Sequence, residues 1–304
     1  MSLTIAFLIS LLPLFRATFI PHPPQVQVEG VAHAAGTNFL FADLRTGDIY
    51  LADVSTRLVT RAVRAPPNRT SVGIHSRKGR IFAAGGGAPF FPVANLYVYD
   101  TATGNEIAAC PVRDENALVN DVIADRDYAY YTDSLLGRIY KLSLAKLPEC
   151  DIDTIHLPQP LFKSDLASAN GLVKYKGGII LVHLDLGTIF FVDLLNRNRV
   201  QQILPPGSML GADGLDIDRK KGGSLLFVAQ NRENLISQWR LGMGDDRKVS
   251  AVFLRKYSSP QFGFPTTVAV TGDYIVAPTS RFDTVEFAEP IPDNVTLGLV
   301  VFRR

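Results

Sequence analysis

Six polar residues recur along the chain, each at the start of an apolar segment that follows a turn of small residues. They are Glu29, Ser71, Asn120, Asn170, Asp213 and Thr266. Two carboxylates, two amides and two hydroxyls offer a metal only oxygen atoms, which suit a hard cation such as Ca²⁺ or Mg²⁺. A carboxylic acid of the same set, Glu29 or Asp213, could instead donate a proton. Asn-Gly and Asp-Gly are also common turn dipeptides, so turns without chemistry are the simpler alternative.

The segments that would position these residues have the pattern of β-strands. Short β-branched and aromatic runs are bounded by Gly, Asp and Asn, as is typical of strands. The clearest runs are residues 38–43, 48–53, 80–84, 95–100, 128–133, 137–142, 178–182, 188–193, 224–229 and 274–277. Beyond the N-terminus, apolar residues do not repeat with helical spacing over any long stretch. The sequence therefore predicts an all-β protein.

The strand pattern repeats with a nearly constant period. Successive polar residues of the set are 42, 49, 50, 43 and 53 positions apart, close to the roughly 40 to 50 residues of a four-stranded propeller blade. Six units predict a six-bladed β-propeller, and we expect residues 20–304 to form it as a single domain. The innermost strand of each blade lines the axis of a propeller. The six polar residues should therefore form one ring in the central channel.

Aromatic residues near the blade openings could provide an apolar wall or lid for a substrate. The candidates are Phe90, Phe91, Phe262, Phe264 and Phe282. Ser71 and His75 are polar candidates for the same substrate-binding surface, and His75 follows Glu29 and Asp213 as a possible proton donor. The alternatives are that the Phe side chains pack between blades and that His75 is a core histidine.

The N-terminal segment is expected to be a signal peptide comprising residues 1–19. Its first 15 residues are almost entirely apolar, but the run is too short for a stable membrane anchor and contains Pro13. An uncleaved tail that lies on a membrane is the alternative. We therefore expect no stable membrane span.

Two further features agree with entry into the secretory pathway. Cys110 and Cys150 are the only cysteines, and one pair suits a single disulfide in an oxidising compartment. Such a bond would close a loop of about 40 residues, which is worth about 4 kcal/mol in the chain-entropy description. Asn68 and Asn294 begin Asn-X-Thr triplets and are predicted glycosylation sites. The expected location is the secretory pathway or the outside of the cell.

The charge pattern argues against nucleic acid as a partner. The chain carries 31 Lys and Arg against 29 Asp and Glu, a formal charge of +2. The basic residues are scattered singly, whereas a nucleic-acid-binding face gathers them. The expected partners are small molecules, and the sequence leaves the oligomeric state open.

The blade openings resemble those of the senescence-marker/gluconolactonase family of six-bladed propellers. That family binds its metal with a Glu in Glu-Gly, an Asn in Asn-Gly-Leu and an Asp in Asp-Gly, which match Glu29, Asn170 and Asp213 here. Asn120 matches an additional channel Asn of the family. The resemblance implies one bound divalent cation, such as Ca²⁺, and a lactonase. Glu29-Gly30 is followed by Val-Ala-His instead of the usual Pro-Val-Trp, so a cofactor-free site is the alternative.

The chain also resembles a small group of secreted fungal propellers, the hetero-Diels-Alderases of tropolone sesquiterpenoid pathways. The leader, the length, the lone cysteine pair and the segments 261–268 and 277–283 carry this likeness. It implies biosynthesis of a meroterpenoid, a secondary metabolite. A hydroxymethyl tropolone would lose water to give an ortho-quinone methide, which would add to a humulene-type terpene. Neither substrate is identified by the residues themselves.

Three functions from different classes therefore remain open. A hetero-Diels-Alderase needs an apolar pocket and donors near the tropolone oxygen. A metal-dependent lactonase needs a divalent cation at the ring. A non-catalytic propeller that binds a partner through its faces needs neither. In both enzymes, Glu29, Asp213, Asn120, Asn170 and Thr266 are the expected catalytic residues.

Overall fold

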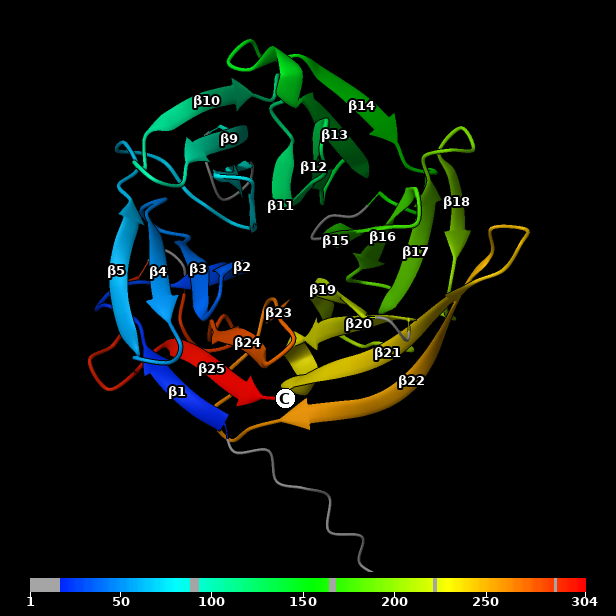
Figure 1. Ribbon diagram of the computed structural model, residues 1–304. Coiled ribbons are helices and arrows are strands. Elements are labelled where there is room, and N and C mark those ends of the chain that lie inside the picture. The colour runs from blue at the N-terminus through cyan, green and yellow to red at the C-terminus, as the bar shows by residue number, and fades with distance from the viewer. Residues whose placement is uncertain (1–16, 88–92, 164–167, 221–222, 287–288) are drawn as a thin grey trace, which may run out of the picture.

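Short strands joined by tight turns pair with their neighbours in sequence, and the resulting sheets surround a central channel (Figure 1). The computed structural model describes residues 17–87, 93–163, 168–220, 223–286 and 289–304. The six sheets confirm the predicted six-bladed β-propeller. Phe90, Phe91 and most of the expected signal peptide lie outside the described residues. No helix among the described residues is long and apolar enough to cross a membrane.

The first three blades comprise the N-terminal half of the chain, and their strands are given from the channel outwards. Blade 1 contains β2 (Val28–Ala35), β3 (Asn38–Asp43), β4 (Ile49–Asp53) and β5 (Leu58–Val63). Blade 2 contains β6 (Ile74–Arg77), β7 (Arg80–Ala84), β9 (Asn95–Asp100) and β10 (Glu106–Pro111). Blade 3 contains β11 (Leu118–Ala124), β12 (Tyr128–Asp133), β13 (Arg138–Ser143) and β14 (Ile152–His156). The short β8 (Gly86–Gly87) adds to blade 3 by pairing with β11.

The other three blades complete the ring. Blade 4 contains β15 (Ala169–Tyr175), β16 (Gly178–His183), β17 (Thr188–Asp193) and β18 (Arg199–Gln202). Blade 5 contains β19 (Ala212–Lys220), β20 (Gly223–Gln230), β21 (Leu235–Met243) and β22 (Val249–Ser258). Blade 6 contains β23 (Ala269–Val270), β24 (Tyr274–Thr279), β25 (Gly298–Arg303) and β1 (Ala17–Pro21). Two 3-10 turns, η1 (Leu144–Lys146) and η2 (Asn231–Glu233), connect strands.

The ring is closed by the N-terminal strand. β1 is the outermost strand of blade 6, where it pairs antiparallel with the C-terminal strand β25. The strand begins at Ala17, three residues before the expected domain boundary, so the propeller includes residues that the predicted signal peptide contained. Hydrogen bonds between the two ends of the chain thus hold the first and last blades together.

The hydrophobic core lies between the blades. β17 illustrates why, because all six of its residues are buried and successive side chains point to opposite faces of the sheet. Phe190 packs against blade 3, whereas Phe191 packs against blade 5. The same alternation produces an apolar cluster at each of the six blade interfaces. These clusters fix the inner strands around the channel.

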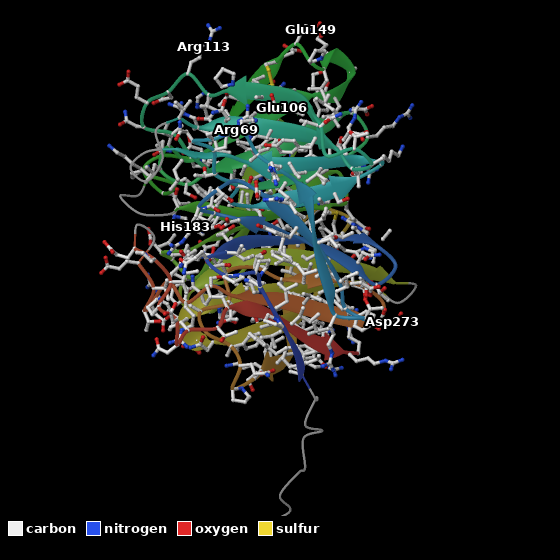
Figure 2. The ribbon with its side chains drawn as sticks, turned by 90° about the vertical axis from the view of Figure 1, so that its left-hand side faces the viewer. Arg69, Glu106, Arg113, Glu149, His183 and Asp273 are labelled. Atoms are coloured by element: carbon white, nitrogen blue, oxygen red, sulfur yellow. A yellow bond between two sulfur atoms is a disulfide. The ribbon has the colours of Figure 1, made fainter. Side chains whose placement is uncertain are left out.

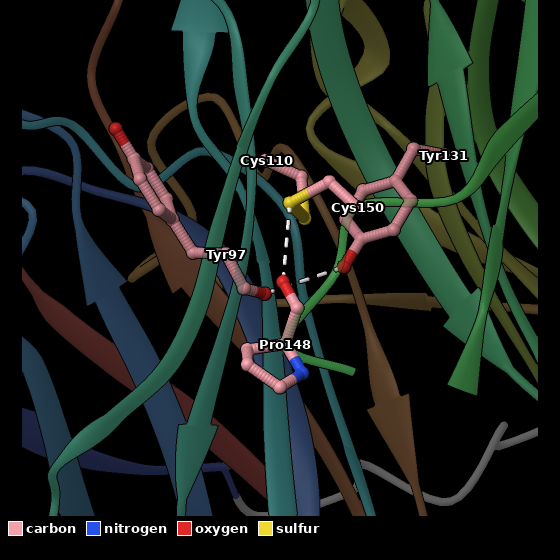
Figure 3. The surroundings of a disulfide bond; sticks show 5 residues. All are labelled: Tyr97, Cys110, Tyr131, Pro148 and Cys150. Carbon is pink, nitrogen blue, oxygen red and sulfur yellow. Dashed lines mark hydrogen bonds between the residues drawn. A yellow bond between two sulfur atoms is a disulfide. The ribbon is translucent and has the colours of Figure 1, made fainter. Parts of the chain in front are cut away.

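The predicted disulfide is present and links two blades (Figure 3). Cys110 is the penultimate residue of β10 in blade 2, and Cys150 lies just before β14 of blade 3. Near it, the Tyr131 hydroxyl donates to the Tyr97 carbonyl at 3.3 Å, again joining blade 3 to blade 2. The Pro148 carbonyl oxygen lies 3.6 Å from Sγ of Cys150. The two predicted glycosylation residues, Asn68 and Asn294, are exposed.

Candidate functional site in the central channel

The inner strands turn their first polar side chains towards the channel through β-bulges. In four blades the register with the next strand shifts at one dipeptide: Glu29-Gly30 in β2, Asn120-Asp121 in β11, Asn170-Gly171 in β15 and Asp213-Gly214 in β19. A bulge places an additional residue in one strand and re-aims a side chain. We call the first residue of each dipeptide a bulge residue and this end of the channel the bulge end.

The glycines after the bulge residues allow the inner strands to approach one another closely. The Gly214 N–H donates to the carbonyl of Thr266 in the next blade at 2.7 Å. A Cβ atom on Gly214 would lie 2.2 Å from Oγ1 of Thr267, too close for any side chain. The Asp-Gly dipeptide therefore has a packing role in the ring in addition to any turn preference.

The same contacts correct one member of the predicted ring. The Gly73 N–H donates to the Asn120 carbonyl at 2.7 Å, as the Gly214 N–H does to Thr266. The residue of blade 2 that is equivalent to a bulge residue is consequently Val72, one position after Ser71. The Ser71 hydroxyl instead donates to the carbonyl of Gly47 at 2.9 Å and is completely buried. Ser71 was predicted for this position because a polar residue was expected at the start of every blade.

Two carboxyl groups form the acidic part of the bulge end. Glu29 is 8% exposed and Asp213 is 5% exposed. Burial raises the pKa of Glu29 well above its usual value, and the nearby charges of Asp213 and Asp121 raise it further. Burial likewise raises the pKa of Asp213 to about 7, although hydrogen bonds from amide side chains oppose this shift. Both shifts favour the protonated form of the pair.

Amide side chains surround the two carboxyls. Asn231, in η2, donates from Nδ2 to Oδ2 of Asp213 at 2.8 Å, and the bulge residue Asn170 also lowers the pKa of Asp213 by hydrogen bonding. Oδ1 of Asn231 and Oδ1 of Asn120 are buried, and neither accepts a hydrogen bond from a described residue. Gly211 is required beside them, because a Cβ there would lie 2.6 Å from Oδ1 of Asn231.

The bulge end fits the divalent cation that the sequence resemblance implies. Buried oxygens without a donor are costly unless something positive approaches them. Together with Glu29, Asn170 and Asp213 they form an oxygen-only set that suits a hard cation. Among the described residues there is no group of three or more His, Cys, Asp and Glu that could hold a metal. A cation would therefore depend on the amide oxygens as well as on the two carboxylates.

The Thr266 side chain is hydrogen-bonded to the protein backbone. Its hydroxyl donates to the Glu29 carbonyl at 2.7 Å and lies 2.9 Å from the Ser280 hydroxyl. The first of these bonds connects blade 6 to blade 1 at the bulge end. Thr266 thus positions the main chain of Glu29, in place of the catalytic role expected from the sequence.

Of the predicted aromatic residues, two form a pair near the bulge end. The ring centroids of Phe264 and Phe282 are 6.2 Å apart, and the ring planes are inclined by 60° in an edge-on arrangement. Phe264 has a φ of 58°, a left-handed conformation that is unusual for a bulky residue. Its N–H donates to Oδ1 of Asn234 at 2.7 Å, which holds it there. Phe262, by contrast, packs in the core of blade 6 against Phe302, so it is not part of a wall.

His75 lies at the other end of the channel. It lines a pocket formed by later residues of the inner strands, which we call the far-end pocket. Figure 2 shows the propeller from the side, with His183 on the face of the bulge end and Asp273 on the opposite face. Because β6 runs away from the bulge end, a residue three positions after Val72 lies deeper in the channel. His75 is therefore separated from the predicted substrate-binding aromatics.

Three polar residues of the channel were not predicted from the sequence. Asn231 lies in a connection between strands, so aligning blade openings could not find it. Asp121 occupies the position that is glycine after Glu29, Asn170 and Asp213, and this departure from the repeat was the available signal. Asp216 is deeper in β19 and carries no motif.

Comparisons with known proteins support the fold. Neither a protein-family model nor a curated protein sequence matches the chain. The regucalcin of Agrobacterium tumefaciens, a calcium-binding protein, superposes with a TM-score of 0.65 at 14% identity, covering 95% of this chain and 94% of its own. The allergen Mala s 1 of Malassezia sympodialis gives a TM-score of 0.65 at 14% identity, covering 96% of each chain.

A luciferin-regenerating enzyme gives a TM-score of 0.62 at 15% identity, covering 95% of each chain. The chain is a six-bladed β-propeller whose fold resembles that of regucalcin. At these identities the likeness concerns the fold, because propellers of one shape serve many functions.

Proposed function

We propose that this protein is an enzyme acting at the bulge end, as a hetero-Diels-Alderase that joins a tropolone ortho-quinone methide to a humulene-type terpene. The observation that carries the proposal is the Glu29 carboxyl group, buried beside Asp213 in a channel with an aromatic pair near its mouth, where burial raises its pKa. A carboxylic acid kept neutral by burial can donate a proton near pH 7.

The first step would be an acid-assisted dehydration. Glu29 donates its proton to the hydroxyl of the hydroxymethyl group, the C–O bond breaks and water leaves. The tropolone hydroxyl loses its proton to the newly formed carboxylate, which restores the acid and leaves a neutral ortho-quinone methide. Amide N–H groups of Asn120 and Asn170 would stabilise charge on the tropolone oxygen.

The second step needs position and protection from water. One C–C bond and one C–O bond form between the quinone methide and an alkene of the terpene, and no atom is lost. Holding both partners in contact lowers the barrier without further chemistry. Phe264 and Phe282 provide apolar surface against which a terpene can pack and which keeps water from the electrophile.

The test is turnover of a hydroxymethyl tropolone with humulene, followed by chiral chromatography and mass spectrometry. We expect an enantioenriched adduct, and a rate at least about 100-fold lower for Glu29→Gln, the usual contribution of general acid catalysis. Glu115→Gln makes the same change at an exposed position and should keep the wild-type rate. A racemic product at the uncatalysed rate, or full activity of Glu29→Gln, would contradict the proposal.

A metal-dependent lactonase is the second candidate, and the buried acceptor oxygens of Asn120 and Asn231 favour it. A divalent cation held by Glu29, Asn170, Asp213 and these amides would polarise a lactone carbonyl and activate water. Aryl and sugar lactones should then be hydrolysed only with Ca²⁺ or another divalent ion, and EDTA should abolish the activity. Asn231→Ala should weaken Ca²⁺ binding in calorimetry, whereas the exposed Asn116→Ala should not.

A further inference from the structure

The far-end pocket is a cavity on the channel axis, opposite the bulge end. It has a volume of about 200 Å³ and receives side chains from the inner segments of all six blades. Aliphatic residues such as Ile74, Val122, Leu172 and Leu215 line it, but most of the surface exposed to the pocket is polar. A concave site at which polar groups converge is a candidate small-molecule site.

Two carboxyl groups from different blades line this pocket. Asp121 accepts the N–H groups of Val122 and Leu172 at 2.8 and 3.2 Å, one with each oxygen. Asp216 accepts those of Ile217 and Val270 at 2.7 and 2.8 Å in the same manner. A carboxylate has about four lone-pair sites, so each group is held rigidly and keeps acceptor capacity for a ligand.

The imidazole of His75 adds a further acceptor. Neither of its ring nitrogens makes a hydrogen bond within the described part of the chain. Burial lowers the pKa of His75 to about 4, and the charges of Arg77 and Arg219 lower it further. The ring is therefore neutral near pH 7, with one nitrogen free to accept a proton donor. Asp121, Asp216 and His75 together present acceptors to a donor-rich ligand.

We infer that the far-end pocket binds a small primary ammonium compound with an apolar body. An ammonium group has three N–H donors and one positive charge, which match the two carboxyl groups and the imidazole. The apolar body would pack against the aliphatic side chains that line the pocket, among them Ile74 and Leu215. A volume of about 200 Å³ limits the ligand to roughly ten non-hydrogen atoms, since the pockets of drug-sized ligands are larger. The inference does not depend on the proposed function at the bulge end.

A charged residue near the pocket allows the sign of the ligand's charge to be tested. Arg219 is exposed and donates to the Lys174 carbonyl at 2.5 Å, and its charge acts on both Asp216 and His75. It would repel an ammonium group and attract a carboxylate. Arg219→Gln should consequently tighten binding of a cation and weaken binding of an anion.

The experiment titrates the whole protein with benzylammonium by calorimetry and by ligand-observed NMR. Benzyl alcohol and benzoate serve as neutral and anionic probes of the same shape. We expect benzylammonium to bind at least ten-fold more tightly than either. Asp216→Asn should weaken it at least ten-fold, whereas Asp246→Asn, an exposed charge-matched control, should leave it unchanged.

Ser76→Tyr provides a second variant that keeps both carboxyls but fills the pocket that Ser76 lines. It should abolish binding while near-ultraviolet circular dichroism confirms an unchanged fold. Equal binding of benzyl alcohol, or tighter binding of benzoate that depends on Arg219, would overturn the inference. Binding that survives both far-end variants and disappears in Asp213→Asn would place the ammonium at the bulge end and overturn it as well.

Discussion

The carboxyl groups of the channel are unusual because they are buried close to one another. In addition to the effect of burial, Asp213 and Asp121 raise the pKa of Glu29, and Asp121 raises the pKa of Asp213. An ionised carboxylate loses hydration there without gaining a full counter-charge. Either a proton or a bound cation can offset this loss of hydration. The proton corresponds to the proposed hetero-Diels-Alderase, and the cation corresponds to the metal-dependent lactonase.

Asp213→Asn should make the stability of the protein less dependent on pH. Folding raises the pKa of Asp213 from 3.8 to about 7, so between these values the folded protein binds more protons than the unfolded chain. The free energy of unfolding therefore falls as the pH rises from about 4 to about 7. The variant should lose up to about 1.4 kcal/mol per pH unit of this slope.

Urea denaturation between pH 4.5 and 7.5, with EDTA present, measures this slope. The exposed Asp246 has a lowered pKa, so Asp246→Asn should keep the wild-type slope throughout that range. If Asp213→Asn and Asp246→Asn give the same slope of the free energy of unfolding against pH, folding does not raise the pKa of Asp213. Added Ca²⁺ should stabilise the wild type most at the upper end of the range, because the carboxylates are then ionised.

The inner strands depend on close contact between neighbouring blades. Gly214→Ala should destabilise the protein by about 1–3 kcal/mol, the usual cost of overpacking, because the new Cβ would overlap Thr267. Gly272→Ala is the matched control, since a Cβ at that position would meet no atom within 4 Å. Urea denaturation at pH 6 compares the two. Equal stability of both variants would mean that the inner strands can separate without cost.

The sequence predicted elements better than it predicted side-chain positions. The runs 38–43, 80–84, 95–100, 128–133 and 188–193 coincide with β3, β7, β9, β12 and β17, because alternating burial against two neighbouring blades leaves a clear apolar pattern. The first channel residue of blade 2 was misplaced by one position, because a polar residue was expected there and the equivalent position holds Val72, next to Ser71. Asn231 could not be predicted, because it reaches Asp213 only through the fold.

The disulfide joins blades 2 and 3, and its loss should affect the whole ring. Cys110→Ser/Cys150→Ser should lower the free energy of unfolding by about 4 kcal/mol, the loop-closure value for the 40-residue separation. Chemical denaturation of the double variant and the oxidised wild type measures the difference. A loss below about 1 kcal/mol would mean that the interface between the two blades needs no covalent link.

Closure of the propeller depends on β1. Five residue pairs join β1 to β25, and Ile20 of β1 is completely buried. A chain that begins at residue 17 keeps this strand, whereas one that begins at residue 22 leaves the edge of β25 unpaired. Burial of Ile20 alone is worth about 1.5–3 kcal/mol, and an unpaired edge also promotes aggregation.

We therefore expect the chain starting at residue 22 to unfold at a lower temperature and to aggregate, and the chain starting at residue 17 to behave as the longer protein does. Differential scanning calorimetry and light scattering compare them. A peptide of residues 17–21 added in excess should partly restore the shorter chain if the lost pairing is the cause. Equal melting temperatures would show that the blade interfaces close the ring without β1.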